Sequence, residues 1–309
     1  MRGSHAMGEL DRLRRSGMIL ANCTSFEIGG EAREYYVPGD TEELQQVCRL
    51  LAQEGRRPHI LGGGCNTLFP DGPFRRPLIS TEGLRRLEVA GRGIIAGTGV
   101  RMHVLIRTAN EAGLGGLEHF IGIPGTVGGA VWMNAGGGGN SFGDRVARIE
   151  AVEVATGELR ILGGSEIRWD YRTSHLDGLA LASVELLLES AEPSVLRQKA
   201  KDHLRRKAAN QPLQQPSAGC VFKNTPAGPA GLLIEKAGLK GVREGGAVVS
   251  ECHANFILNE TGSASAQDVI TLVGRVRRRV EEVFGVRLET EIVIPENEPP
   301  ASASVDPKL

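Results

Sequence analysis

The sequence predicts a mixed fold of α+β or α/β construction, in which short strands and helices follow one another. Between Tyr35 and Thr81 the pattern is extended, then helical, then extended again. Asp40 and Glu43 form a capping box at the start of this helix, and Gly55 ends it. No segment repeats along the chain, which excludes solenoids and propellers.

Hydrophobic periodicity and turn residues predict the remaining elements. Two hairpins are expected, one turning at Gly91-Arg92 and the other at Thr156-Gly157. A long helix is expected to begin at a second capping box, formed by Ser265 and Asp268. The other expected strands and helices are Tyr35–Val37, His59–Leu61, Leu87–Val89, Gly93–Ala96, Arg101–Ala112, Ile149–Ala155, Leu159–Leu162, Leu179–Leu188, Pro193–Ala209 and a last strand at Val286–Ile294.

Composition narrows the class of protein. The 309 residues include 36 Lys+Arg and 37 Asp+Glu, and this formal charge of −1 argues against binding to the phosphate backbone of nucleic acids. No apolar run approaches the ~20 residues of a membrane span, and the charged start lacks the apolar core of a secretory signal. The five cysteines are odd in number and widely spaced, which does not suit a disulfide framework or a metal site. The sequence therefore indicates a reduced, cytoplasmic protein without nucleic-acid or membrane partners.

Glycines mark the first candidate site. Gly62, Gly63 and Gly64 follow a predicted strand directly, and Cys65, Asn66 and Thr67 come next. Glycines without a Cβ allow backbone N–H groups to converge on an anion, and the side chains of Asn66 and Thr67 can add hydrogen bonds. The loop matches neither a Walker loop nor a Rossmann fingerprint. A plain tight turn is the alternative.

The densest glycine region is the second candidate. Twelve glycines lie between Gly113 and Gly143, and the centre of the region is Gly122–Gly136. Pro124 is placed for the first turn of a helix whose unpaired N–H groups can accept a pyrophosphate or lie against a flat ring. Close packing between domains is the alternative. Two loops of this kind in one domain suit a dinucleotide better than a single phosphate.

Three further segments carry reactive side chains. Cys220 lies beside Gly219 and is followed by Lys223 and Asn224, although a single cysteine is usually an inert core residue. Arg172 is an isolated arginine of the kind that often lies at the surface. Glu289 and Glu291 share one face of the expected last strand, where both carboxylates could simply face water.

Together these segments resemble the UDP-N-acetylenolpyruvoylglucosamine reductase (MurB) family. The resemblance runs from about Asn22 to Glu296. It is carried by Thr24-Ser25-Phe26, Gly29-Gly30, Leu61–Thr67, Gly116-Leu117-Glu118, Gly122–Gly136, Tyr171–Ser174, Ala218–Asn224, His253–Ile257, Asn259 and Leu288–Ile292. The short interval between Arg172 and Cys220 is similar to the shorter subgroup of the family, called type II.

The resemblance implies an α+β fold with a two-subdomain FAD-binding module of the vanillyl-alcohol-oxidase type and a C-terminal substrate-binding domain. The domains expected are an N-terminal extension or tag at 1–18, the FAD-binding domain at 19–191 with subdomains at about 19–84 and 85–191, the substrate domain at 192–296, and a disordered tail at 297–309. The family holds FAD noncovalently and uses NADPH to reduce the enolpyruvyl ether of UDP-N-acetylglucosamine, a small-molecule substrate, to UDP-N-acetylmuramate for peptidoglycan. We expect a monomer.

The resemblance also assigns roles to residues. Arg172 would stabilise charge on the substrate and touch the cofactor, Cys220 would donate a proton, and Glu291 would help to stabilise an enol, with Glu289 as the neighbour that could take its place. Lys223 and Asn224 would bind the UDP-sugar. The residues expected to line FAD are Gly62, Gly63, Gly64, Cys65, Asn66, Thr67, Gly122, Ile123, Pro124, Gly125, Thr126, Gly128, Gly129 and Asn134.

The sequence departs from the usual family pattern at two cysteines. Cys220 and Cys65 both stand where the family usually has serine. A thiol with a pKa near 8.5 is mostly protonated at pH 7 and can serve as an acid. Two other interpretations remain open from sequence, a flavin oxidase that uses oxygen and a nucleotide-binding protein without catalytic activity.

Overall fold

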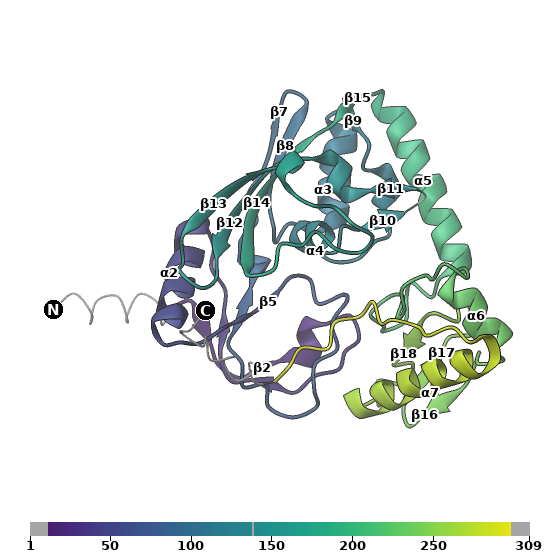
Figure 1. Ribbon diagram of the computed structural model, residues 1–309. Helices are drawn as coiled ribbons and strands as arrows, with labels where there is room; N and C mark the ends of the chain where they lie inside the picture. Colours follow the sequence, from purple (N-terminus) through teal and green to yellow (C-terminus); the bar gives the residue numbers. More distant parts are fainter. Residues whose placement is uncertain (1–11, 138, 298–309) are drawn as a thin grey trace, which may run out of the picture.

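The computed structural model describes residues 12–137 and 139–297, and these fold into three parts (Figure 1). The first part contains a four-stranded sheet in the order β1 (Arg14–Arg15), β4 (Tyr35–Tyr36), β6 (Leu78–Ser80), β5 (His59–Leu61). Strands β4 and β5 both pair in parallel with β6. Helix α2 (Thr41–Gln53) connects β4 to β5 and begins after Asp40, as expected. Its predicted capping box is only half formed, because the Asp40 carboxylate accepts a hydrogen bond from the Glu43 N–H at 2.9 Å, whereas the Glu43 carboxylate accepts from the Gly39 N–H.

Part of the expected N-terminal extension belongs to this first sheet. Leu13 is buried, and Arg14–Arg15 pairs antiparallel with β4. Strand β2 (Met18–Ile19) pairs with β3 (Glu31–Ala32). Residues 1–11 lie outside the described residues, as do residues 298–309 of the disordered tail expected at 297–309.

The second part is a five-stranded antiparallel sheet that contains both predicted hairpins. Its order is β13 (Leu159–Gly163), β12 (Val146–Glu153), β14 (Leu179–Leu187), β8 (Gly93–Gly97), β7 (Leu87–Ala90). Helices α3 (Met102–Glu111) and α4 (Val127–Trp132) pack on one face and form the largest apolar core with β8, β12 and β14. Short strands complete this part, β9 (Leu114–Gly115) with β15 (Glu189–Ser190) and β10 (Gly136–Gly137) with β11 (Asn140–Ser141). Single-turn helices lie at Leu20–Cys23, Thr81–Gly83, Glu118–Phe120, Phe142–Arg145 and Gly164–Glu166.

Helix α5 (Pro193–Asn210) runs along the side of the molecule from the second part to the third (Figure 1). The third part has α6 (Ala230–Lys236), a three-stranded sheet and α7 (Ala266–Phe284). The sheet is β16 (Arg243–Glu244), β17 (Ala247–Val249), β18 (Ile257–Leu258). Ser265 and Asp268 form the predicted capping box of α7. None of the described helices is long and apolar enough to cross a membrane.

The prediction of a last strand at Val286–Ile294 is wrong. This segment makes only two isolated bridges, Thr290 with Phe222 and Val293 with Thr67. The reason is that the segment leaves the third part and crosses to the first, so no partner strand stays beside it. Leu288 and Ile292 are nevertheless buried, which explains the apolar alternation that suggested a strand.

A stabilising substitution is expected in α7. Gly274 lies in the interior of this helix, and a Cβ added there meets no atom within 4 Å. Because alanine loses less backbone entropy than glycine on folding, Gly274→Ala is expected to raise the free energy of unfolding by about 0.5–1 kcal/mol. Urea denaturation measures this change. Gly245→Ala is the opposite control, since Gly245 has φ 51° and its Cβ would meet the capping carboxylate of Asp268. Equal stability of Gly274→Ala and the parent would contradict the prediction.

Candidate active site

A cavity of about 1270 Å³ lies where the three parts meet. It is larger than the 300–1,000 Å³ of typical small-molecule pockets, so it suits an extended ligand or two ligands side by side. Both glycine loops singled out in the sequence line it, together with the loop that follows α5. The cavity lining includes residues 62–67, 122–126, 128–129, 132–133, 207, 211–220 and 291, together with Arg172.

The first glycine loop, Gly62–Thr67, follows β5 at the carboxyl end of the parallel strands. A Cβ on Gly63 would lie 2.7 Å from the Cα of Gly125, closer than real Cβ atoms approach. Gly64 has φ 65°, and its Cβ would overlap the carbonyl oxygen of Cys23. These positions require glycine, and the loop therefore presents backbone rather than side chains to the cavity.

The second loop lies against the first. Gly125 contacts Gly63, and the hydroxyl of Thr126 lies 3.0 Å from where a Cβ of Gly62 would be. Thr126 is the N-cap of α4, which begins at Val127, so the expectation that Pro124 occupies the first turn is wrong. Pro124 instead precedes the cap, where its fixed φ shapes the loop that lines the cavity. Gly128 serves packing as well, because its Cβ would lie 2.8 Å from Thr98.

Arg172, Cys220 and Glu291 come from three distant segments and line the same cavity. Arg172 has φ 61° in a tight turn closed by backbone hydrogen bonds between Asp170 and Thr173. A non-glycine residue in this conformation is strained, and such strain is often found at functional sites. The turn directs the guanidinium toward Glu291, whose Oε1 lies 3.0 Å from Arg172 Nε.

The Arg172–Glu291 contact is an ion pair without an aligned hydrogen bond. The Nε–H of Arg172 is buried and has no hydrogen-bond partner in the described part of the chain, despite the short distance to Glu291. Nη1 of Arg172 donates a long hydrogen bond of 3.4 Å to the Gly136 carbonyl. The guanidinium thus retains donors for an anionic ligand.

Burial controls the protonation of the other two groups. It raises the pKa of Cys220 to about 11; the Glu291 carboxylate adds to this and the Arg172 charge opposes it. Burial also raises the pKa of Glu291, against the opposing charge of Arg172. At neutral pH the Cys220 thiol is therefore a proton carrier rather than a nucleophile.

Alkylation should report this state of Cys220. We expect iodoacetamide to modify Cys220 slowly at pH 8 and increasingly fast as the pH approaches 11, because the thiolate is the reacting species. Cys252, which is exposed, is the internal comparison and should react first. Peptide mass spectrometry after timed quenching measures both sites. Modification of Cys220 at pH 8 as fast as Cys252 would contradict the assignment.

The structure separates the two glutamates that the sequence left as alternatives. The side chain of Glu291 is only 13% exposed and faces Arg172, whereas that of Glu289 is 77% exposed and lies 3.7 Å from Lys223 Nζ. Glu291 therefore lines the cavity, whereas Glu289 does not.

Three expected site residues lie outside the cavity lining. Lys223 pairs with Glu289, and the side chain of Asn224 accepts a hydrogen bond from the Ala230 N–H at 3.0 Å, at the start of α6. Asn134 is buried; its Nδ2 donates to the Asp170 carbonyl at 3.0 Å, and its Oδ1 accepts from the Gly143 N–H at 3.0 Å. Asn134 therefore braces the turn that carries Arg172, and this placement does not support contact with a cofactor.

Sequence reasoning missed Lys207 and Trp132 as cavity residues. Lys207 is half-buried near the end of α5, where burial and the charge of Arg172 lower its pKa to about 8. The basic run in Pro193–Ala209 was the available signal, but solvation is the usual state of such side chains. Trp132, at the end of α4, also lines the cavity.

The residues present fit an FAD. Two mutually contacting backbone loops, in which a Cβ on Gly63 or Gly64 would clash, an extended cavity and a charged group at one wall match the needs of a pyrophosphate and a planar ring. The fold and site thus define a flavoprotein of the two-subdomain FAD-binding class with an added C-terminal domain. Residues 32–163 match the family described as FAD binding domain, and residues 211–295 match UDP-N-acetylenolpyruvoylglucosamine reductase, C-terminal domain.

The chain belongs to the UDP-N-acetylenolpyruvoylglucosamine reductase family. It is 42% identical over 92% of its length to UDP-N-acetylenolpyruvoylglucosamine reductase 2 of Symbiobacterium thermophilum, covering 92% of that protein. It is 41% identical over 89% of its length to the reductase of Moorella thermoacetica, covering 91% of it. The crystal structure of the reductase (MurB) from Thermus caldophilus superimposes with a TM-score of 0.79 at 34% identity, covering 91% of this chain and 99% of that one.

These comparisons confirm the predicted family and the α+β fold class. The two matched ranges lie inside the expected domains at 19–191 and 192–296, whose ends stay predictions. FAD is the cofactor that the family and the matched domain define.

Proposed function

We propose that this protein reduces UDP-N-acetylglucosamine enolpyruvate to UDP-N-acetylmuramate with NADPH, through FAD, in the synthesis of a peptidoglycan precursor. The supporting observation is the convergence of Arg172, Cys220 and Glu291 on a cavity that both glycine loops also line. The proposal extends to the cytoplasm as the site of reaction, supported by five free cysteines, which suit a reducing compartment. A monomer stays a prediction.

Noncovalently bound FAD would be held by Gly62–Thr67 and Gly122–Thr126, and it would supply the hydride-transfer chemistry that links NADPH to the enolpyruvyl substrate. The glycine loops bind it through backbone. The mutual contact of Gly63 and Gly125 keeps both loops in place before the cofactor binds.

Arg172 and Glu291 act on the charge that the reaction creates. Adding a hydride to the enolpyruvyl methylene places negative charge beside the substrate carboxylate. The planar, positively charged guanidinium of Arg172 can pair with that carboxylate. Glu291, whose pKa is raised by burial, can hold a proton and hydrogen-bond to the enol oxygen.

Cys220 supplies the proton that completes the reaction. Its S–H bond breaks as a C–H bond forms at the substrate carbon next to the carboxylate, and the thiolate left behind regains a proton from water. The raised pKa keeps the donor loaded at neutral pH. The charge of Arg172, which lowers the pKa of Cys220, stabilises the transient thiolate.

Lys223 and Asn224 remain proposed contacts for the UDP-sugar. The partner of Lys223 is the exposed Glu289 at 3.7 Å, and such surface ion pairs contribute little free energy. A phosphate group of the ligand could therefore replace Glu289 as the partner of Lys223.

Anaerobic absorbance spectroscopy tests the proposed function. Purified protein should be yellow, lose its flavin absorbance on adding NADPH, and regain it faster with UDP-N-acetylglucosamine enolpyruvate than with air. A flavin oxidase would be reoxidised fastest by oxygen, and a nucleotide-binding protein without activity would not bleach. Either result would reject the proposed reductase.

A further inference from the structure

Helix α5 concentrates positive charge in a chain that is otherwise acidic. It carries six basic side chains against the single acid Asp202, a formal charge of +5, whereas the whole chain has −1. The residues outside α5 therefore carry −6 together. Five of the six basic residues are exposed, at positions 197, 199, 201, 205 and 206.

The C-terminal end of this helix reaches the cavity. Lys207 lines it, and the Cδ of Lys207 would lie 3.2 Å from a Cβ on Gly122 in the second glycine loop. In the described part of the chain no carboxylate lies within ion-pair distance of Lys207. The exposed basic side chains of α5 therefore lead to the cavity wall, where the amine of Lys207 has no acidic partner among the described residues.

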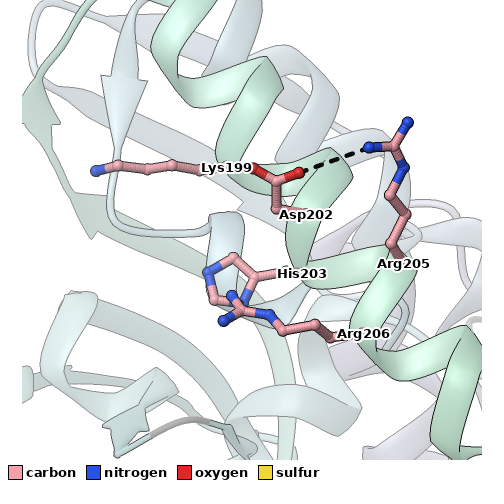
Figure 2. Close-up of a pocket in the computed structure, with 5 residues that line it drawn as sticks. All are labelled: Lys199, Asp202, His203, Arg205 and Arg206. Atoms are coloured by element: carbon pink, nitrogen blue, oxygen red, sulfur yellow. Dashed lines mark hydrogen bonds and ion pairs between the residues drawn. The ribbon is translucent and has the colours of Figure 1, made fainter.

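Little of this charge is neutralised near the cavity. Figure 2 shows the turns of α5 that precede Lys207, with Asp202 directed at Arg205, a pair 3.9 Å apart. Lys199 lies 3.6 Å from Glu118, while Lys201 and Arg206 have no carboxylate at ion-pair distance among the described residues. Exposed pairs as long as Arg205–Asp202 are weak, so the positive field extends into solvent.

We propose that the C-terminal half of α5 steers phosphate-bearing ligands into the cavity, a role that rests on the proposed function. NADPH and the UDP-sugar both carry a diphosphate, so one positive field can accelerate the encounter of both. A charged surface beside a cleft raises association rates without touching the bound ligand, and salt screens the effect. The residues that act in this way need not contribute to catalysis.

The test compares charge removal close to the cavity with charge removal far from it. Along the helix axis Arg205 lies about 3 Å and Lys201 about 9 Å from Lys207, whereas Arg197 lies about 15 Å away. The test variant is Arg205→Gln and the matched control is Arg197→Gln, so that each removes one arginine charge from the same helix. Stopped-flow tryptophan fluorescence follows association of NADP⁺ with the holoenzyme, because Trp132 lines the cavity. Rates are taken at 0.1 M and 1 M NaCl, where the screening length is about 10 and 3 Å.

We expect the test variant to associate roughly threefold or more slowly than the parent at 0.1 M salt and equally fast at 1 M. The parent should slow as salt rises, the Arg197→Gln control should follow the parent, and kcat should be unchanged in both variants.

Two results would overturn the steering role. One is equal association rates for the test variant and the control at 0.1 M salt. The other is a deficit that persists at 1 M, which would indicate a direct contact. A parent holoenzyme that does not bind NADP⁺ would instead overturn the proposed function, and the steering role with it.

Discussion

The Cys220→Ala variant is expected to be reduced by NADPH at the parent rate yet to lose product formation by about 10²–10⁴-fold. Of the three convergent groups, the thiol is the one that can be removed while both Arg172 and Glu291 stay in place. Its pKa of about 11 means that it enters the reaction protonated. Single-turnover mixing separates the two half-reactions, since flavin bleaching and flavin recovery are observed in sequence.

Two control variants make this result specific. Cys220→Ser keeps a proton-bearing group of similar size and should retain substantial turnover. Cys252→Ala removes an exposed thiol outside the cavity lining and should leave both half-reactions unchanged. Normal turnover of the enolpyruvyl sugar by Cys220→Ala would show that another group delivers the proton.

The Gly63→Ala variant is expected to lose bound flavin. The new Cβ would lie 2.7 Å from Gly125 Cα, so the two loops must separate. Overpacking of this kind costs about 1–3 kcal/mol, enough to weaken cofactor binding by roughly tenfold or more. The ratio of flavin to protein absorbance after gel filtration measures the loss, and circular dichroism checks that the fold persists.

Gly72→Ala is the matched control for this change. Gly72 also lies in a loop of the first part, but an added Cβ meets no atom within 4 Å. This variant should keep its flavin. If Gly63→Ala also eluted with full flavin, the contact between the two loops would not be what holds the cofactor.

Local signals made much of the fold predictable. The strand His59–Leu61, both hairpins and the caps of α2 and α7 depend on neighbouring residues, and each is found where it was expected. The prediction of a last strand at Val286–Ile294 failed for the opposite reason. Its apolar alternation was real, but a strand also needs a partner, and the partner is set by the path of the chain between distant parts.

The site was predictable as a set of segments but not as a geometry. The sequence pattern marked Arg172, Cys220 and both glycine loops, whereas the choice between Glu289 and Glu291 depended on which carboxyl met Arg172. Lys207 was missed because a basic helix gives no sign of which of its side chains meets a cavity. Asn134 stood next to cavity residues in the chain, but its amide turned inward to brace the turn of Arg172.

The crossing segment after α7 connects Glu291, a proposed catalytic residue, to the first glycine loop, Gly62–Thr67. Val293 exchanges backbone hydrogen bonds with Asn66 and Leu68, at 2.8 and 2.9 Å, and the Asn66 side chain donates to the Glu291 carbonyl at 3.1 Å. Local unfolding of this segment would displace both the carboxyl of Glu291 and the Gly62–Thr67 loop in the same event. Heat inactivation and release of the yellow chromophore should therefore follow a single time course.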